Sequence, residues 1–308
     1  RKRICKMRCL MRLTSSIFST IVLLNIGAVN LVLDTFISSV IFPLQAQAKP
    51  TTILSDLSEQ KSQPKEVDPT KLRQKMRVRL MRMVNGKRVY APGTSAGIPS
   101  AFGANWGDFY VAIAGATADR VRPVIDGGIS TSLGLGNATD IFGLELNYNN
   151  LSMRRFATNG SFNAKIHRSI YSTPSTYIAG AVGWNNFAKY GSDTAHTSSS
   201  VYGIVSAYHF LKTNPANPLP INLSLGVGGA PLFSNAGVGL IAGAGIQVHP
   251  NIGVSTAWSG RGLNLAASYL PMRTLPLTLN VVYGDVLKNT EAGSVLSFSI
   301  GYGFDFTP

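Results

Sequence analysis

Histidines are the residues in this chain best suited to acid–base or metal chemistry. There are four of them: His167, His196, His209 and His249. A hydrolase would need a serine beside a histidine, and only His196 has such neighbours, in the stretch Ser198–Ser200. That stretch predicts a solvated loop, whereas the other three histidines predict wall or turn positions. We therefore predict no catalytic residue, no metal site, no cofactor and no enzymatic activity.

Glycines give a second motif that invites a chemical interpretation. Gly134, Gly136 and the run GVGLIAGAGI at 237–246 have the spacing of phosphate-binding loops. A phosphate loop needs a helix N-terminus directly behind it, and the apolar alternation around these glycines predicts strands instead. Glycines on a curved strand relieve crowding and permit bending. We predict a structural role for them.

Charge is concentrated in the first third of the chain. The formal net charge is +14, but residues 108–308 carry eleven basic and nine acidic residues, so 11 − 9 leaves only +2 there. A nucleic-acid partner is therefore not predicted. Both cysteines, Cys5 and Cys9, precede residue 10. The remainder can form neither a disulfide nor a thiolate metal site.

Residues 1–48 have the organisation of a secretory signal peptide. Six basic residues within 1–12 precede an apolar stretch over 17–44, which ends in Ala46-Gln47-Ala48. Small residues at Ala46 and Ala48 fit the pattern that signal peptidase cleaves. We predict cleavage after Ala48. The alternative is an uncleaved membrane anchor, since about 20 apolar residues suffice to span a bilayer.

Residues 49–107 predict a basic, Pro- and Gly-punctuated periplasmic linker. Its first part, 49–70, is polar and predicts a flexible chain. In 71–83, four apolar residues are spaced to share one face of a short helix. That element could be a solvated basic arm, a helix plugging a barrel, or an arm on anionic lipid. The turn-rich residues 91–107 predict the approach to the next domain.

From Asp108 onward, apolar residues alternate with small or polar ones in runs of about ten, as in transmembrane strands. In 219–229, for example, Leu223 and Leu225 oppose Asn222 and Ser224. The pattern predicts an all-β fold, a closed antiparallel transmembrane β-barrel of about twelve strands over 108–308. The predicted strands are 108–118, 123–136, 139–151, 160–170, 176–186, 199–211, 219–229, 236–249, 252–259, 262–270, 276–286 and 293–306.

The non-apolar face of these strands predicts a polar lumen. Its pore-lining candidates are Glu145, Asn147, Lys165, His167, Asn222, Gln247, Asn264, Asn280 and Asp305. Glu145 lies between two leucines, so period two turns it away from lipid, and Lys165 is the nearest inward counter-charge. We also expect Tyr208 and Phe210 to face lipid, which would turn His209 inward.

The last predicted strand carries the most specific signal. Ser299, Gly301, Phe304 and Phe306 have the spacing of polar, glycine and two large apolar residues. This strongly resembles the C-terminal assembly signal of bacterial outer-membrane β-barrels, although Thr307 and Pro308 extend beyond the usual end. More loosely, residues 108–308 look like uncharacterised porin-like proteins of cyanobacteria. The resemblance implies an outer-membrane location, with membrane lipid and the barrel assembly machinery as partners.

Four functions fit a barrel of this kind. The leading hypothesis is a passive channel for small solutes or ions. The alternative is a structural or assembly-associated barrel without transport, whose basic linker contacts cell-wall polymer. A secretion translocator and a lipid-modifying enzyme are less favoured, because the segment before the barrel is short and no paired Ser and His are found.

Overall fold

The structure is a computed structural model that describes residues 81–84, 87–121, 123–191, 198–212 and 219–306. The predicted signal peptide, with its cleavage residues Ala46 and Ala48, lies outside the described residues. So does most of the predicted helix at 71–83. Its last three residues belong to strand β1 (Met81–Val84) and are not helical.

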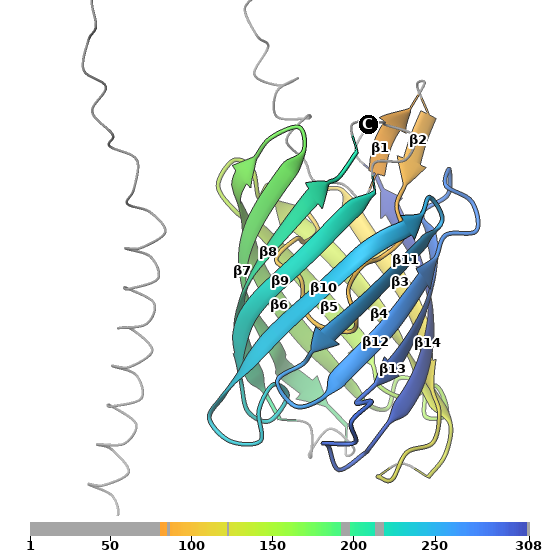
Figure 1. The fold of residues 1–308 in the computed structure, drawn as a ribbon. Helices are drawn as coiled ribbons and strands as arrows, with labels where there is room; N and C mark the ends of the chain where they lie inside the picture. Colours follow the sequence, from red (N-terminus) through yellow and green to blue (C-terminus); the bar gives the residue numbers. More distant parts are fainter. Residues whose placement is uncertain (1–80, 85–86, 122, 192–197, 213–218, 307–308) are drawn as a thin grey trace, which may run out of the picture. The chain divides into compact units, whose positions relative to one another are not determined.

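Twelve antiparallel strands close into a barrel (Figure 1). Each strand pairs with the strands before and after it in the sequence, and the last one, β14, pairs with the first one, β3. The strands are β3 (Asp108–Ala116), β4 (Asp126–Gly136), β5 (Gly143–Asn150), β6 (Gly160–Ser172), β7 (Thr176–Tyr190), β8 (Ser200–Phe210), β9 (Pro220–Gly229), β10 (Val238–His249), β11 (Ile252–Trp258), β12 (Leu263–Tyr269), β13 (Leu277–Gly284) and β14 (Val295–Asp305).

These strands confirm the twelve predicted segments one for one. The largest differences are four residues, as at the start of β5, predicted at 139 and observed at Gly143. The agreement has a physical cause, since period-two alternation and turn residues mark strands wherever each face meets one environment. Closure gives every strand two neighbours, so no edge is left with unpaired backbone groups.

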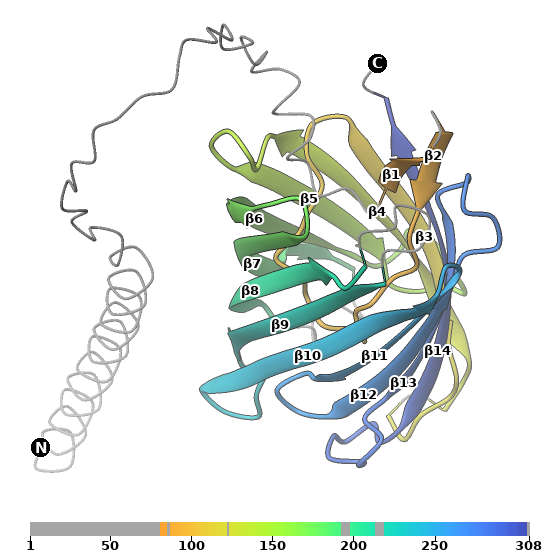
Figure 2. The same ribbon diagram turned by 45° about the horizontal axis from the view of Figure 1, so that its top comes forward.

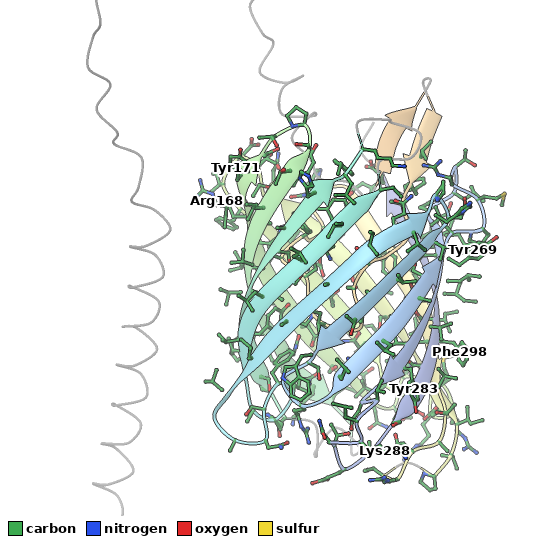
Figure 3. All side chains as sticks on the ribbon, in the orientation of Figure 1. Arg168, Tyr171, Tyr269, Tyr283, Lys288 and Phe298 are labelled. Carbon is green, nitrogen blue, oxygen red and sulfur yellow. The ribbon has the colours of Figure 1, made fainter. Side chains whose placement is uncertain are left out.

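The outer surface of the barrel is apolar and exposed. On β9, Leu223, Leu225 and Val227 are 54%, 58% and 48% exposed, while the alternating Asn222 and Ser224 are buried. A water-soluble barrel would place its apolar residues inside, so this outside-in arrangement is that of a transmembrane β-barrel. Figure 3 shows side chains projecting outward from the wall of the barrel. Among the described residues, no helix is long and apolar enough to cross a membrane.

Aromatic side chains lie toward both rims of this outer surface. Tyr269 ends β12 and Tyr283 lies near the opposite rim on the neighbouring strand β13; they are 46% and 40% exposed. Figure 3 shows Tyr171 and Tyr269 toward one rim and Tyr283 toward the other. Tyrosine and tryptophan favour the two membrane–water interfaces, so these positions fit two aromatic girdles.

The chain reaches the barrel at the rim where β3 begins and β14 ends, which we call the proximal end; the opposite rim is the distal end. Strands β1 and β2 (Lys87–Tyr90) form a small hairpin. The backbone N–H of Tyr90 then donates to the carbonyl of Arg273 in the β12–β13 connection, at 2.8 Å. From there the chain turns into the barrel, and Figure 2 shows it passing through the interior between β2 and β3.

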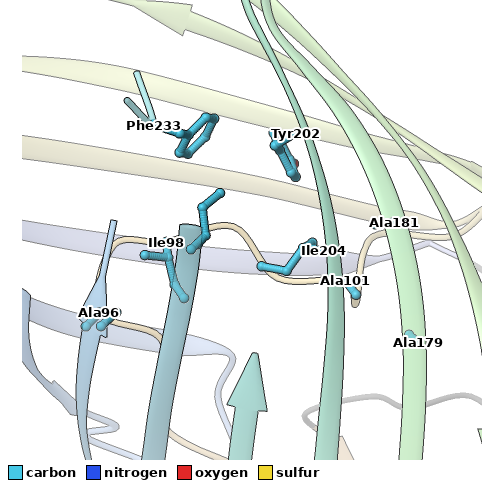
Figure 4. Packing of buried hydrophobic residues seen from close by; sticks show 10 residues of the cluster. Ala96, Ile98, Ala101, Ala179, Ala181, Tyr202, Ile204 and Phe233 are labelled. Carbon is cyan, nitrogen blue, oxygen red and sulfur yellow. The ribbon is translucent and has the colours of Figure 1, made fainter. Parts of the chain in front are cut away.

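Residues 91–105, which we call the internal segment, therefore build a core inside the barrel. Ala96, Ile98 and Ala101 of this segment are buried against apolar side chains of the wall (Figure 4). The wall residues of the cluster are Ala179, Ala181, Tyr202, Ile204, Ile241 and Ala257, joined by Phe233 from the β9–β10 connection. The sequence predicts a linker over this stretch, and its turn-rich composition gives no sign that it lies in the lumen.

Candidate functional site in the barrel lumen

The internal segment crosses the lumen and returns to the proximal end. The N–H of Gly93 donates to the Ser268 hydroxyl on β12 at 2.9 Å, and the N–H of Ala101 donates to the Ser206 hydroxyl on β8 at 3.0 Å. At its end, the N–H of Trp106 donates to the carbonyl of Gly136 at 2.8 Å, beside the start of β3. The wall side chains thus replace the backbone partners that an irregular segment lacks.

Wall glycines make room for the internal segment. A Cβ atom on Gly245 would lie 2.2 Å from the carbonyl oxygen of Thr94, and one on Gly253 would lie 2.4 Å from that of Gly93. On β4, a Cβ atom on Gly134 would lie 2.1 Å from the carbonyl oxygen of Asn105. These glycines are therefore needed for close backbone approach, a stronger demand than the curvature predicted from the sequence.

Glu145 and Lys165 are cross-strand neighbours that hold the end of the internal segment. Their side chains form an ion pair at 3.1 Å. Glu145 Oε2 accepts the Ala104 N–H at 2.8 Å, and Lys165 Nζ donates to the Phe102 carbonyl at 3.1 Å. Next to them, His167 Nε2 lies 2.9 Å from the Ala104 carbonyl. The two charges pair with one another and also form hydrogen bonds with the backbone of the internal segment. These contacts compensate the free-energy cost of removing both charges from water.

Five of the six remaining predicted pore residues divide into two groups. Asn264 Nδ2 donates to the Ala96 carbonyl at 3.0 Å, Asn222 Nδ2 lies 3.5 Å from the Thr94 carbonyl, and Gln247 is only 1% exposed. These three lie beneath the internal segment. Asn147 and Asn280 instead bond other wall side chains: the Ser132 hydroxyl donates to Asn147 Oδ1, and Asn280 Nδ2 donates to the Ser299 hydroxyl at 3.3 Å.

The lumen wall thus has two sectors. In the covered sector, on β6 to β12, most inward residues are buried, whereas Ser255, Asn264 and Ala266 are half-buried. The buried ones include Lys165, His167, Ala179, Ala181, Tyr202, Ile204, Ser206, Tyr208, Asn222, Ser224, Ile241, Gln247, Ala257 and Ser268. In the open sector, centred on β14, β3 and β4, the inward residues remain partly or fully accessible. They are Tyr110, Ala112, Ala114, Ser130, Ser132, Asn147, Asn149, Asn280, Ser297 and Ser299.

Strand β8 corrects one expectation. Tyr208 is 4% exposed and faces inward, where its ring packs against Phe102 of the internal segment at 6.3 Å between centroids. His209 is therefore turned outward, where its Nδ1 lies 2.8 Å from the Thr176 hydroxyl. The expectation was wrong because both faces of β8 are apolar. The inward face meets the internal segment and not water, so apolarity does not identify the lipid side there.

The β9–β10 connection covers the same side of the lumen at the distal end. Phe233 is 7% exposed and packs on the ring of Tyr202, with centroids 5.5 Å apart. The guanidinium of Arg261 donates to Asn235 Oδ1 at 2.9 Å and to the Pro231 carbonyl at 3.0 Å, which fixes the loop. Phe233 was not predicted as a lumen residue, because in the sequence it is a single aromatic residue among turn-forming neighbours.

Carboxylates lie at both ends of the open sector. Asp108 and Asp305 are cross-strand partners at the proximal end. Asp126 begins β4 at the distal end, where Oδ2 accepts the Ser152 hydroxyl at 2.7 Å. The ten residues of the open sector between them include no charged side chain. A solute in this space would meet hydroxyl, amide and methyl groups.

The predicted assembly residues share β14 and its end. Ser299 and Gly301 alternate with outward side chains, whereas Phe304 and Phe306 are 50% and 55% exposed. The N–H of Phe306 donates to the Gly107 carbonyl at 3.0 Å, and its ring lies 5.9 Å from that of Trp106. The final residues are therefore joined to the start of the barrel. Their role as an assembly signal stays a prediction.

Comparison with known proteins finds similar solved structures at low sequence identity. No family model and no curated protein matches the chain. Among solved structures, the KdgM porin in complex with disordered oligogalacturonate aligns over 65% of this chain and 99% of its own, with 8% identity and a TM-score of 0.41. The Acinetobacter baumannii outer membrane protein Omp33 aligns over 65% and 98%, with 10% identity and a TM-score of 0.37.

An outer membrane channel from Pseudomonas putida F1 aligns over 69% of this chain and all of its own, with 12% identity and a TM-score of 0.39. All three TM-scores are below 0.5. The looser resemblance to cyanobacterial proteins stays a prediction.

Proposed function

We propose that this protein is a passive outer-membrane channel in which small solutes cross through the open sector of the lumen. One observation carries the proposal. The barrel encloses a polar interior that its own internal segment fills on one side only, so that inward residues such as Tyr110 and Ala114 remain exposed. A barrel that served only as a scaffold would gain stability by filling this space with side chains.

The outer-membrane location is part of this proposal. It is supported by the exposed apolar outer face and by aromatic residues at both rims. It is also supported by an even number of antiparallel strands, so that the first strand begins and the last strand ends at the same rim. Membrane lipid is then the direct partner of the outer face. The barrel assembly machinery and cell-wall polymer stay predicted partners, since the basic segment 49–80 lies outside the described residues.

The predicted pore residues receive two roles in this proposal. Glu145, Lys165, His167, Asn222, Asn264 and Gln247 hold or underlie the internal segment and so set the width of the passage. Asn147, Asn280 and Asp305 line or flank the passage itself. Neither group has the arrangement of a nucleophile with its base, which supports transport without enzymatic activity.

Single-channel recording from purified full-length protein in planar bilayers tests the proposal. We expect ohmic current steps that are small for a barrel of this size, because one side of the lumen is filled. The absence of current steps from correctly folded, heat-modifiable protein would favour the second candidate, a structural barrel. The internal segment that crosses the lumen is the observation that keeps this candidate open.

A further inference from the structure

We propose that Tyr110 on β3 sets the size limit for solutes that cross the open sector, and that Gly301 on β14 determines how far its ring extends into the passage. This inference rests on the proposed channel function and names the residue that decides its size selectivity. Its starting point is side-chain volume. Tyr110 is the only aromatic residue among the ten inward residues of the open sector, and the other nine are alanine, serine or asparagine.

Tyr110 lies near the proximal end of the passage. It follows Asp108, the first residue of β3, by two positions and pairs with Gly303 on β14 and Ser132 on β4. Its side chain is 37% exposed, although it faces the lumen and not lipid. A pore selects by its narrowest cross-section, so one large side chain among small ones has the strongest influence on which solutes pass.

Both ends of the internal segment reach the same part of the lumen. The N–H of Asn105 donates to Asp108 Oδ2 at 2.9 Å, two positions before Tyr110. At the other end of the segment, a Cβ atom on Gly93 would lie 3.5 Å from Asn280 Oδ1, an inward atom of β13. The solute path beside Tyr110 is therefore bounded by the internal segment as well as by the wall.

Gly301 allows the ring of Tyr110 to lie along the wall. The ring extends past its direct partner Gly303, and a Cβ atom on Gly301 would overlap the phenol oxygen. Gly301 is not among the glycines with positive φ, so an alanine fits its backbone and the demand is for space alone. Because the wall of β14 lies behind the ring, a side chain at residue 301 would displace the phenol toward the passage.

A Cβ atom on Gly303 would have a different effect. It would make only ordinary van der Waals contacts, at 3.7 Å with the Cβ atom of Pro276 and at 3.9 Å with Cδ2 of Tyr110. The two glycines are two positions apart on the same inward face of β14. They therefore form a matched pair, in which the same added methyl group displaces the ring from one position only.

Single-channel recording and liposome swelling with the full-length protein provide the test. Swelling compares glucose with the larger sucrose; both are uncharged, so they differ mainly in size. We expect Tyr110→Ala to raise the conductance and to raise sucrose entry relative to glucose severalfold. Gly301→Ala should lower both quantities. The double variant should behave as Tyr110→Ala does, because the added methyl group acts only through the ring.

Two control variants should keep the unmodified conductance. Gly303→Ala adds its methyl group without displacing Tyr110. Tyr302→Ala removes a tyrosine from the outer face of the neighbouring strand, where its ring lies 4.7 Å from that of Phe304. Gly301 also belongs to the predicted assembly signal, so heat-modifiability checks folding, and conductance is read from single channels, which does not depend on yield. If Gly301→Ala does not assemble, Tyr110→Trp enlarges the ring instead and should lower the conductance.

The outcomes separate this inference from the channel proposal. If folded, unmodified protein gives no current and admits no sugar, the channel proposal itself fails. If the protein conducts but Tyr110→Ala leaves conductance and sugar entry unchanged, the channel stands and Tyr110 is not its size filter. Equal effects of Gly301→Ala and Gly303→Ala, or an effect of Gly301→Ala that persists without Tyr110, would contradict the role given to Gly301.

Discussion

The two sectors of the lumen wall come from the same kind of strand and differ in what they face. In the covered sector, Ser206 and Ser224 are buried, bonded to one another at 2.8 Å, and Ser206 also accepts from the internal segment. In the open sector, Ser130 and Ser132 bond neighbouring asparagines and stay partly accessible. A serine on a barrel wall is thus a packing residue in one half and a solvent-facing residue in the other.

The comparison shows how a barrel can adjust its passage without changing its strand number. Strand number and shear set the barrel diameter. The internal segment then removes part of the resulting lumen, using small residues such as Ala96 and Ala101 on its side and glycines on the wall. Residues far from the passage therefore determine its width, because they hold the segment in place.

Removal of the internal segment should give the largest effect. Replacing residues 92–104 by a Gly/Ser sequence of equal length removes the contacts with the covered sector. We expect single-channel conductance to rise severalfold, since the lumen of a twelve-stranded barrel would then be water-filled. Heat-modifiability on electrophoresis checks that the barrel still forms. An unchanged conductance in folded protein would show that the segment does not restrict the passage.

Arginine substitutions compare the outer face with the two sectors of the lumen. Leu225→Arg places a charge on the 58%-exposed lipid face and should cost about 2–4 kcal/mol if the residue lies near the bilayer midplane. Asn222→Arg should also destabilise the fold, because Asn222 is 7% exposed beneath Thr94, whereas Ser130→Arg in the open sector should be tolerated. Urea unfolding in lipid vesicles measures the three free energies. If Asn222→Arg lowered the free energy of unfolding no more than Ser130→Arg does, the two sectors would not differ in packing.

Substitutions in the ion pair that holds the internal segment should have a smaller effect, which depends on whether one charge or both are removed. Lys165→Met leaves Glu145 without its cation and should destabilise the barrel by on the order of 3 kcal/mol. The double substitution Glu145→Gln with Lys165→Met should recover part of that loss, since no unpaired charge remains. A double-mutant cycle of unfolding free energies measures the coupling. Additive effects would mean that the two side chains do not interact.

Loss of the negative charge on Asp285, in the β13–β14 connection, should have the smallest effect, which should be confined to the distal end. Its carboxylate accepts the N–H groups of Asn289 and Thr290 at 2.9 and 2.6 Å. Burial alone would raise the pKa of Asp285, but the hydrogen bonds from Thr290 and Asn289 and the nearby Arg120 outweigh it and hold the pKa below its ordinary value. Its contribution to stability is therefore present above the unfolded pKa and is lost as the pH falls through the folded pKa.

Hydrogen exchange of residues 286–294 measures this effect. We expect lower protection, taken relative to the intrinsic exchange rate at each pH, in acid for the unmodified protein, and already at neutral pH for Asp285→Asn. The rest of the barrel should exchange as before. Acid sensitivity of the loop that persists in Asp285→Asn would assign it to another group.

The amino-acid sequence by itself determined the strands and most of their faces. Alternation identified all twelve strands, and it placed Leu223 and Leu225 outside and Asn222 inside, because each face of a strand meets one solvent. It also placed Glu145 and Lys165 on the same side, and the register then paired them. The uneven charge distribution followed from the positions of the charged residues in the sequence.

Only the tertiary structure decided which part of the lumen is open. The turn-rich residues 91–107 carry no local signal that they lie inside a barrel, and Ala101 bonds Ser206 across 105 positions of sequence. For the same reason, the inward face of β8 could not be recognised. Tyr202, Ile204 and Tyr208 contact the internal segment and Phe233 instead of water. An apolar side chain indicates an apolar environment, but it does not show whether lipid or another part of the protein forms that environment.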